Sequence, residues 1–192
     1  MAQATLKLVA VGDNLTGKKT ELLHQMCGDI ADGPYSASVF ENRRHSVSLD
    51  SGDTYTQVEM VDTTGQEKYG ALADLSYADA DVFLLCVSLG DSASVDSIRE
   101  IWIPKLENYY KRSRLPAMMM VAVETEANTP GGTDPEARRK AQVMADSGIF
   151  YRNRIWCVGT GEGCNTAREI LEAAVLAGRA ERSGFFQRCH VQ

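Results

Sequence analysis

The sequence contains no long apolar run. A membrane-spanning helix needs about 18 consecutive apolar residues, and no stretch of the 192 residues approaches that length. An excess of positive charge is also missing, because 20 lysines and arginines face 26 aspartates and glutamates, for a formal net charge of -6. A protein whose main role is to hold nucleic acid needs a concentrated positive field. We therefore expect a soluble, cytoplasmic chain with no nucleic acid as its main partner.

The cysteines and histidines lack the spacing of a metal site. The five cysteines are an odd number, spread over positions 27, 86, 157, 164 and 189. This pattern indicates a reducing compartment rather than a disulfide framework. Cys86 stands inside the apolar run DVFLLCVSL, where we expect it to be a small buried hydrophobe.

What the sequence does contain is an alternation of strand and helix patterns. The length and the 44% hydrophobic composition suffice for one well-buried core but not for two comfortable domains. Short strands are predicted at 5 to 12 and 154 to 158, and a hairpin is predicted where RRHSVSL and YTQVEMVD flank DSGD. Continuous apolar runs at 81 to 89 and 117 to 123 are typical of central parallel strands.

Helical patterns separate these strands. One helix starts at the paired lysines 18 and 19, another carries Ile98, Trp102, Leu106 and Tyr109, a third begins at an Asp134 cap with Pro135 and stops at Gly148, and a last one spans 166 to 178. Residues 29 to 42 are rich in turn formers and predict a long surface loop. The order βαββαβαβαβα predicts an α/β fold with a six-stranded, mostly parallel sheet, helices on both faces and ligands at the carboxyl ends of the strands.

The first loop carries a phosphate-binding pattern. Gly12 to Lys18 satisfies G-x-x-x-x-G-K between a strand and a helix, which is the context that the motif requires. Backbone amides of such a loop form an anion nest, and its lysine supplies charge for the terminal phosphates. The motif then asks for Ser or Thr as a magnesium ligand, but the next residue is Lys19, and Thr20 follows it.

A second motif, DTTGQEKYG at 62 to 70, follows the third predicted strand. Asp62 is placed to hold magnesium through water, and Gly65 can offer its backbone amide to a terminal phosphate. Gln66 is a candidate for orienting an attacking water. The combination of this motif with a phosphate loop about 45 residues earlier is a strong signal of nucleotide binding.

With these motifs the chain resembles the small GTPases of the Ras superfamily, and within them the Rho and Rac branch. The resemblance covers residues 5 to about 178 and is most specific in SVFENRR, in DTTGQEKYGALADLSYADADVFLLCVSL and in SASVDSIREIWIPKL. It implies a P-loop NTPase domain of the Ras-like type over residues 1 to 178, followed by a tail over 179 to 192. It also implies GTP or GDP with Mg2+ as ligands.

The resemblance bears on which lysine meets the phosphate. If the family spacing is counted back from Leu22 and Leu23, the phosphate lysine is Lys19 and the metal threonine is Thr20. The loop then has one extra residue. If the family spacing is counted forward from Gly12, the phosphate lysine is Lys18 and the metal hydroxyl is lost. A helix shifted by one residue would rotate its core leucines by about 100°, which favours the first count.

The other site residues implied by the resemblance include three departures from the family pattern. Ser38 stands for the threonine that touches magnesium, and Thr64 stands for an alanine, which could slow hydrolysis. VETE at 123 to 126 replaces the base-reading motif, so that Glu126 keeps a carboxylate for guanine while Glu124 reverses the charge of a lysine. The remaining nucleotide-contacting residues implied are Gly12, Asp13, Gly17 and Gly65.

The last four residues, CHVQ, resemble a prenylation box with Cys189 as the acceptor. One lipid with little basic charge, from Arg179, Arg182 and Arg188, would give weak and reversible membrane attachment. The alternative is an ordinary C-terminal cysteine.

Two main functions are open at this point. The first is a Rho-like switch in which residues 30 to 42 and 65 to 77 bind effector and regulator proteins, ordered by GTP and released by slow hydrolysis. The second is a pseudo-GTPase, an interaction module that binds nucleotide weakly or not at all. A P-loop enzyme for another nucleotide, such as ATP, is a third reading.

Overall fold

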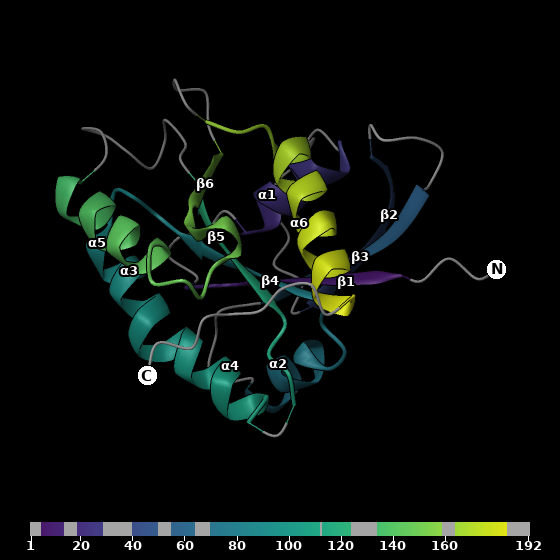
Figure 1. Cartoon of the computed structure of the whole chain (residues 1–192), viewed down its shortest axis with the longest axis horizontal. Helices are drawn as coiled ribbons and strands as arrows, with labels where there is room; N and C mark the ends of the chain where they lie inside the picture. The colour runs from purple at the N-terminus through teal and green to yellow at the C-terminus, as the bar shows by residue number, and fades with distance from the viewer. Residues whose placement is uncertain are drawn as a thin grey trace.

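The computed structural model describes residues 5–13, 19–28, 40–49, 55–63, 70–111, 113–123, 134–158 and 164–183. A six-stranded sheet lies at the centre, in the order β2-β3-β1-β4-β5-β6 (Figure 1). Only the pairing of β2 with β3 is antiparallel among these neighbours. The strands are β1 (Leu6–Val11), β2 (Phe40–Ser48), β3 (Tyr55–Thr63), β4 (Val82–Val87), β5 (Ala117–Val123) and β6 (Ile155–Val158). The predicted fold class and the predicted hairpin are therefore confirmed.

Helices cover both faces of this sheet, as predicted. The helices α1 (Lys19–Cys27) and α6 (Ala167–Arg182) lie side by side on one face (Figure 1). The other face carries α2 (Gly70–Tyr77), α3 (Ser92–Ser97), η3 (Ile98–Trp102), α4 (Ile103–Tyr109) and α5 (Pro135–Ala145). A short helix η4 (Tyr151–Asn153) precedes β6. None of the described helices is long and apolar enough to cross a membrane.

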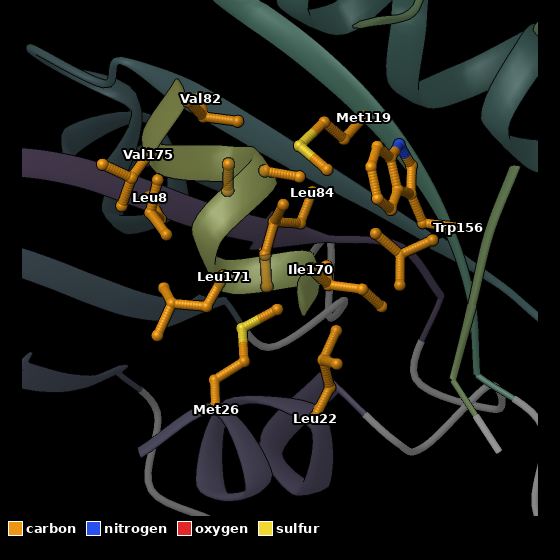
Figure 2. Close-up of a cluster of buried hydrophobic side chains, with 14 of the residues drawn as sticks. Leu8, Leu22, Met26, Val82, Leu84, Met119, Trp156, Ile170, Leu171 and Val175 are labelled. Carbon is orange, nitrogen blue, oxygen red and sulfur yellow. The ribbon is translucent and has the colours of Figure 1, made fainter. Parts of the chain in front are cut away.

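The two faces bury separate hydrophobic clusters. Along β1, Leu6, Leu8 and Ala10 belong to the cluster under α1 and α6, while Val9 and Val11 belong to the other. Successive side chains of a strand point to opposite faces, which explains the alternation. Figure 2 shows the first cluster, in which side chains of α1 and α6 meet those of β1, β4, β5 and β6.

The long loop that we predicted over 29 to 42 is wrong at its end. The strand β2 begins at Phe40, which pairs with Thr63, and Asn42 pairs with Val61. The exposed Asn42 amide also donates to the Glu59 carboxylate at 3.2 Å. Pairing with a long neighbouring strand overrides the turn-forming composition of this segment, because strand preference depends mostly on context. Residues 29 to 39 lie outside the described part of the chain.

The last helix is longer than predicted. We ended it at Gly178, but α6 continues to Arg182, so two arginines that we assigned to the tail belong to the helix. A Cβ at Gly178 would lie 3.1 Å from the side chains of Leu6 and Val82. The glycine therefore lets the helix approach the sheet closely and does not end it.

Two helix starts agree with the sequence. The Asp134 side chain accepts from the Glu136 amide at 3.0 Å, and Pro135 opens α5. At α6, Thr166 and Glu169 form a reciprocal capping box.

The helix between β4 and β5 differs from the prediction in its geometry. It consists of α3, η3 and α4 in succession, and η3 is a π turn in which the Ile103 amide bonds to the Ile98 carbonyl. Ile98, Trp102 and Leu106 are buried, as the predicted stripe requires, but Tyr109 is 40% exposed. The extra residue of a π turn rotates the side chains that follow it around the helix axis, relative to their positions in an α-helix. This rotation accounts for the exposure of Tyr109.

Candidate functional site

The phosphate loop, which we define as residues 12 to 19, starts at the carboxyl end of β1. The neighbouring strand β3 brings Asp62 level with Ala10. The Thr63 hydroxyl donates to the Ala10 carbonyl at 2.6 Å and ties the two strand ends together. The start of α1, Gly12 and Asp62 therefore meet at the edge of the sheet where ligands of α/β folds bind.

Gly12 is held in a conformation that needs glycine. Its φ is +140°, in the region that L-residues rarely adopt. A Cβ at this position would lie 2.5 Å from the Cys86 carbonyl oxygen of β4. The first turn of the phosphate loop therefore passes directly against the backbone of a central strand.

Lys19 is the first residue of α1 and is only 5% exposed. Its Nζ donates to the Gly12 carbonyl at 2.6 Å, so its ammonium lies at the beginning of the loop. Burial lowers the pKa of Lys19, and the nearby Cys86, Asp62 and Asp13 act in the opposite direction. An ammonium has three N–H donors, and this bond uses one of them.

Thr20 and Asp62 form the second pair of the site. The Thr20 hydroxyl donates to Oδ2 of Asp62, which joins α1 to β3. Hydroxyl and carboxylate oxygens are hard ligands of the kind that Mg2+ prefers, and Mg2+ at phosphate sites commonly uses one or two protein ligands. A Mg2+ ion and a phosphate group therefore fit the chemistry of this donor set.

Asp13 has two partners that the sequence did not indicate. Its Oδ1 accepts from the Ser97 hydroxyl at 2.8 Å and from the Trp102 indole N–H at 2.9 Å. We expected Asp13 among the nucleotide-contacting residues, but these bonds direct its carboxylate to α3 and η3. Ser97 and Trp102 were missed because five positions separate them, a spacing that an α-helix would place on different faces.

The remaining expected site residues are outside the described part of the chain. They are Gly17, Lys18, Ser38, Thr64, Gly65, Gln66, Glu124, Glu126 and Cys189. The structure thus brings together Gly12, Lys19, Thr20 and Asp62, at the place where the motifs predicted a phosphate and its metal.

Comparison with known proteins shows the family of the chain. The model of the Ras family matches residues 7–153. The chain is 32% identical over 200 aligned positions to the Rho-related GTP-binding protein RhoB of Homo sapiens, covering 98% of this chain and 96% of the relative. It is 34% identical to the Rho-related protein racE of Dictyostelium discoideum, over 78% of this chain and 65% of the relative. It is also 30% identical to the Ras-like GTP-binding protein RHO1 of Entamoeba histolytica, over 88% of this chain and 74% of the relative. The chain therefore belongs to the Ras family, and within it to the Rho-like small GTPases.

Proposed function

We propose that this chain is a signalling switch that binds GTP and GDP together with Mg2+ at the carboxyl ends of β1 and β3. The observation that carries the proposal is the buried Lys19 ammonium at the start of the phosphate loop, beside the pair formed by Thr20 and Asp62. The named relatives, two of which are described as GTP-binding, support guanine as the base.

In this proposal Lys19, and not Lys18, neutralises the terminal phosphates. A buried ammonium costs free energy unless an anion compensates for it, and the lowered pKa of Lys19 is the mark of that cost. A bound phosphate would be such an anion and would stabilise the Lys19 ammonium. The buried Leu22 and Leu23 fix the rotation of α1, which supports the count with one extra residue in the loop.

Thr20 and Asp62 are the proposed magnesium residues in the described part of the chain, with Ser38 as a third from the first switch. Mg2+ would neutralise phosphate charge there. Gly12 carries no side chain that could obstruct the loop. We propose that its bond to Lys19 keeps the ammonium in position before nucleotide arrives.

The finer parts of the proposal rest mostly on residues outside the described ranges. Gln66 would orient the attacking water, and Thr64 beside it would slow hydrolysis. Glu126 would accept hydrogen bonds from guanine. Residues 30 to 42 and 65 to 77 would contact effectors and regulators, and a prenyl group on Cys189 would give weak membrane attachment.

The rival, a pseudo-GTPase without nucleotide, is less favoured. The features that favour it are VETE at 123 to 126, VGTGEG at 158 to 163 in place of a base-contacting Ser-Ala pair, and the abnormal phosphate loop. In that loop the metal hydroxyl is lost if Lys18 is the phosphate lysine. The bond between Thr20 and Asp62 supports the other count, in which that hydroxyl is kept.

The test compares two lysines that differ by one position. Wild-type protein purified with Mg2+ is denatured, and the nucleotide released is identified and quantified by chromatography; we expect near-stoichiometric GDP or GTP. Lys19→Met should weaken GDP binding by about 10-fold to 150-fold, the equivalent of one charge-assisted hydrogen bond. Lys18→Met should weaken it much less.

Three outcomes would contradict parts of the proposal. A folded wild-type protein that carries no nucleotide and is not stabilised by added GDP and Mg2+ would favour the pseudo-GTPase. A larger loss from Lys18→Met than from Lys19→Met would overturn the assignment of the lysine. Release of ATP or ADP would favour the third reading.

A further inference from the structure

We propose that Trp102 is a positioning residue of the phosphate loop: its indole N–H and the Ser97 hydroxyl hold the Asp13 carboxylate and thereby slow the release of nucleotide. The proposal rests on the nucleotide-binding function proposed above. It adds Trp102 to the residues that shape the site. Trp102 is far from the phosphate loop in sequence and lies in a different helix layer from α1.

The contact itself is direct. Ser97 and Trp102 both donate to the same oxygen, Oδ1 of Asp13, at 2.8 and 2.9 Å. Trp102 is 4% exposed. Hydrogen bonds to a carboxylate are stronger than neutral ones, and partial burial strengthens them further.

The π turn is what allows both residues to reach one acceptor. In an α-helix, residues five apart are rotated by about 140° around the axis, so their side chains diverge. In a π turn, residue i bonds to residue i+5, and the two stack one turn apart. The bond from the Ile103 amide to the Ile98 carbonyl fixes this wider turn. Single π turns inside α-helices are frequent at functional sites.

Asp13 is well placed to pass this restraint to the loop. It follows Gly12 directly, and Gly12 is confined by the Cys86 carbonyl and bonded to Lys19. Asp13 is also among the groups whose charge favours the ammonium form of Lys19. If the carboxylate turned away, both the first turn of the loop and the field at Lys19 would change.

The indole ring also links the loop to α2. Lys105 Nζ lies 5.5 Å from the ring centroid of Trp102 and 5.5 Å from that of Tyr77. Tyr77 is the last residue of α2, which belongs to the second proposed switch. A partner that displaced α2 would therefore act on the contacts of Trp102, and through them on Asp13.

The chain supplies a matched control in its other tryptophan. Trp156 is also 4% exposed, and a cation covers its ring as well, with Arg154 at 4.2 Å. It lies in the cluster on the opposite face of the sheet (Figure 2). Its buried indole nitrogen has no hydrogen-bond partner among the described residues. Trp156→Phe thus makes the same change of ring without the loss of a bond.

The kinetic test measures dissociation of a fluorescent GDP analogue in Mg2+ from the full chain. Trp102→Phe and Ser97→Ala should each accelerate release by about 3-fold to 10-fold, a part of the value of one hydrogen bond to a charged group. Ser97→Thr keeps the hydroxyl and should restore the wild-type rate. Trp156→Phe should stay within about twofold of it, because it loses no hydrogen bond. Should Trp102→Phe not fold, Ser97→Ala with its rescue by threonine carries the same test.

A spectroscopic readout separates positioning from packing. The two tryptophans give two indole N–H signals in a nitrogen-15 correlation spectrum, and Trp156→Phe identifies the signal of Trp102. Addition of GDP and Mg2+ should shift the Trp102 signal, and Asp13→Asn should reduce that shift.

Each outcome has one meaning. If wild-type protein binds no GDP, the proposed function fails and this inference fails with it. If wild-type protein binds GDP, but Trp102→Phe and Trp156→Phe release it equally fast or the Trp102 signal ignores nucleotide, only the positioning role is overturned.

Discussion

Gly12 offers the sharpest test of the geometry of the phosphate loop. In Gly12→Ala, the new Cβ would lie 2.5 Å from the Cys86 carbonyl oxygen. Carbon and oxygen approach to about 3.3 Å in weak contacts, so the two groups must separate by about 0.8 Å. The strand β4 cannot yield easily, because it is bonded to β1 on one side and to β5 on the other.

Two costs add up at this position. A residue with a Cβ held at this positive φ costs about 1–3 kcal/mol, and the steric overlap should add about 1–3 kcal/mol, as overpacking of a rigid core does. Gly28→Ala is the matched control, since Gly28 has φ +74° and nothing within 4 Å of its Cβ position. Both variants reduce the entropy of the unfolded chain alike, so this contribution cancels in their difference.

The assay is urea unfolding of the two variants and the wild type, followed by circular dichroism without nucleotide or Mg2+, because bound ligand would alter the free energy of unfolding. We expect Gly12→Ala to lose at least about 1–3 kcal/mol more than Gly28→Ala, because only Gly12 adds a steric overlap to its positive φ. Equal losses in the two variants would show that a side chain fits between the loop and β4, and would refute the close approach.

Three further changes test other parts of the fold. Thr166→Ala should lower the free energy of unfolding by about 1 kcal/mol through loss of the α6 cap, and Thr166→Ser should not, as urea unfolding would show. Hydrogen bonds from the Thr166 backbone and side chain lower the pKa of Glu169 from 4.5, so its contribution to stability is present above that pH and is lost as the pH falls; Glu169→Gln should therefore weaken the acid-induced fall in melting temperature. Asp81→Ala removes the acceptor of both the Lys7 amide and Arg182 and should cost about 1–3 kcal/mol in the same assay, whereas Arg182→Ala should cost less because the Lys7 amide keeps its bond.

Much of the fold was predictable because its central strands are continuous apolar runs. The runs that became β4 and β5 are apolar throughout, since both faces of each strand are buried. The cap at Asp134 was readable because a side-chain acceptor and a proline stand together. These signals lie within short segments of the sequence, so they could be recognised without knowledge of the tertiary contacts.

Features that depend on tertiary contacts were not predictable. Glycine is typical of a helix end, but Gly178 lies inside α6 and lets the helix pack closely against Leu6 and Val82. The π turn was not predicted from the sequence, because the apolar spacing of Ile98, Trp102 and Leu106 fits an uninterrupted α-helix equally well. The two possible counts of the lysines could not be decided by spacing alone, and it is the burial of Lys19 that supports one of them.

The two separate hydrophobic clusters have a consequence for cooperativity. Asp13, at one end of the phosphate loop, is bonded to the helix layer of α3 and η3, while Lys19 and Thr20, at the other end, begin α1 in the opposite layer. Asp13 and Lys19 are therefore tied to opposite helix layers. A ligand that bound between these two residues would link the opening of the two layers, so amide hydrogen exchange in α5 and in α6 should slow in parallel when it binds.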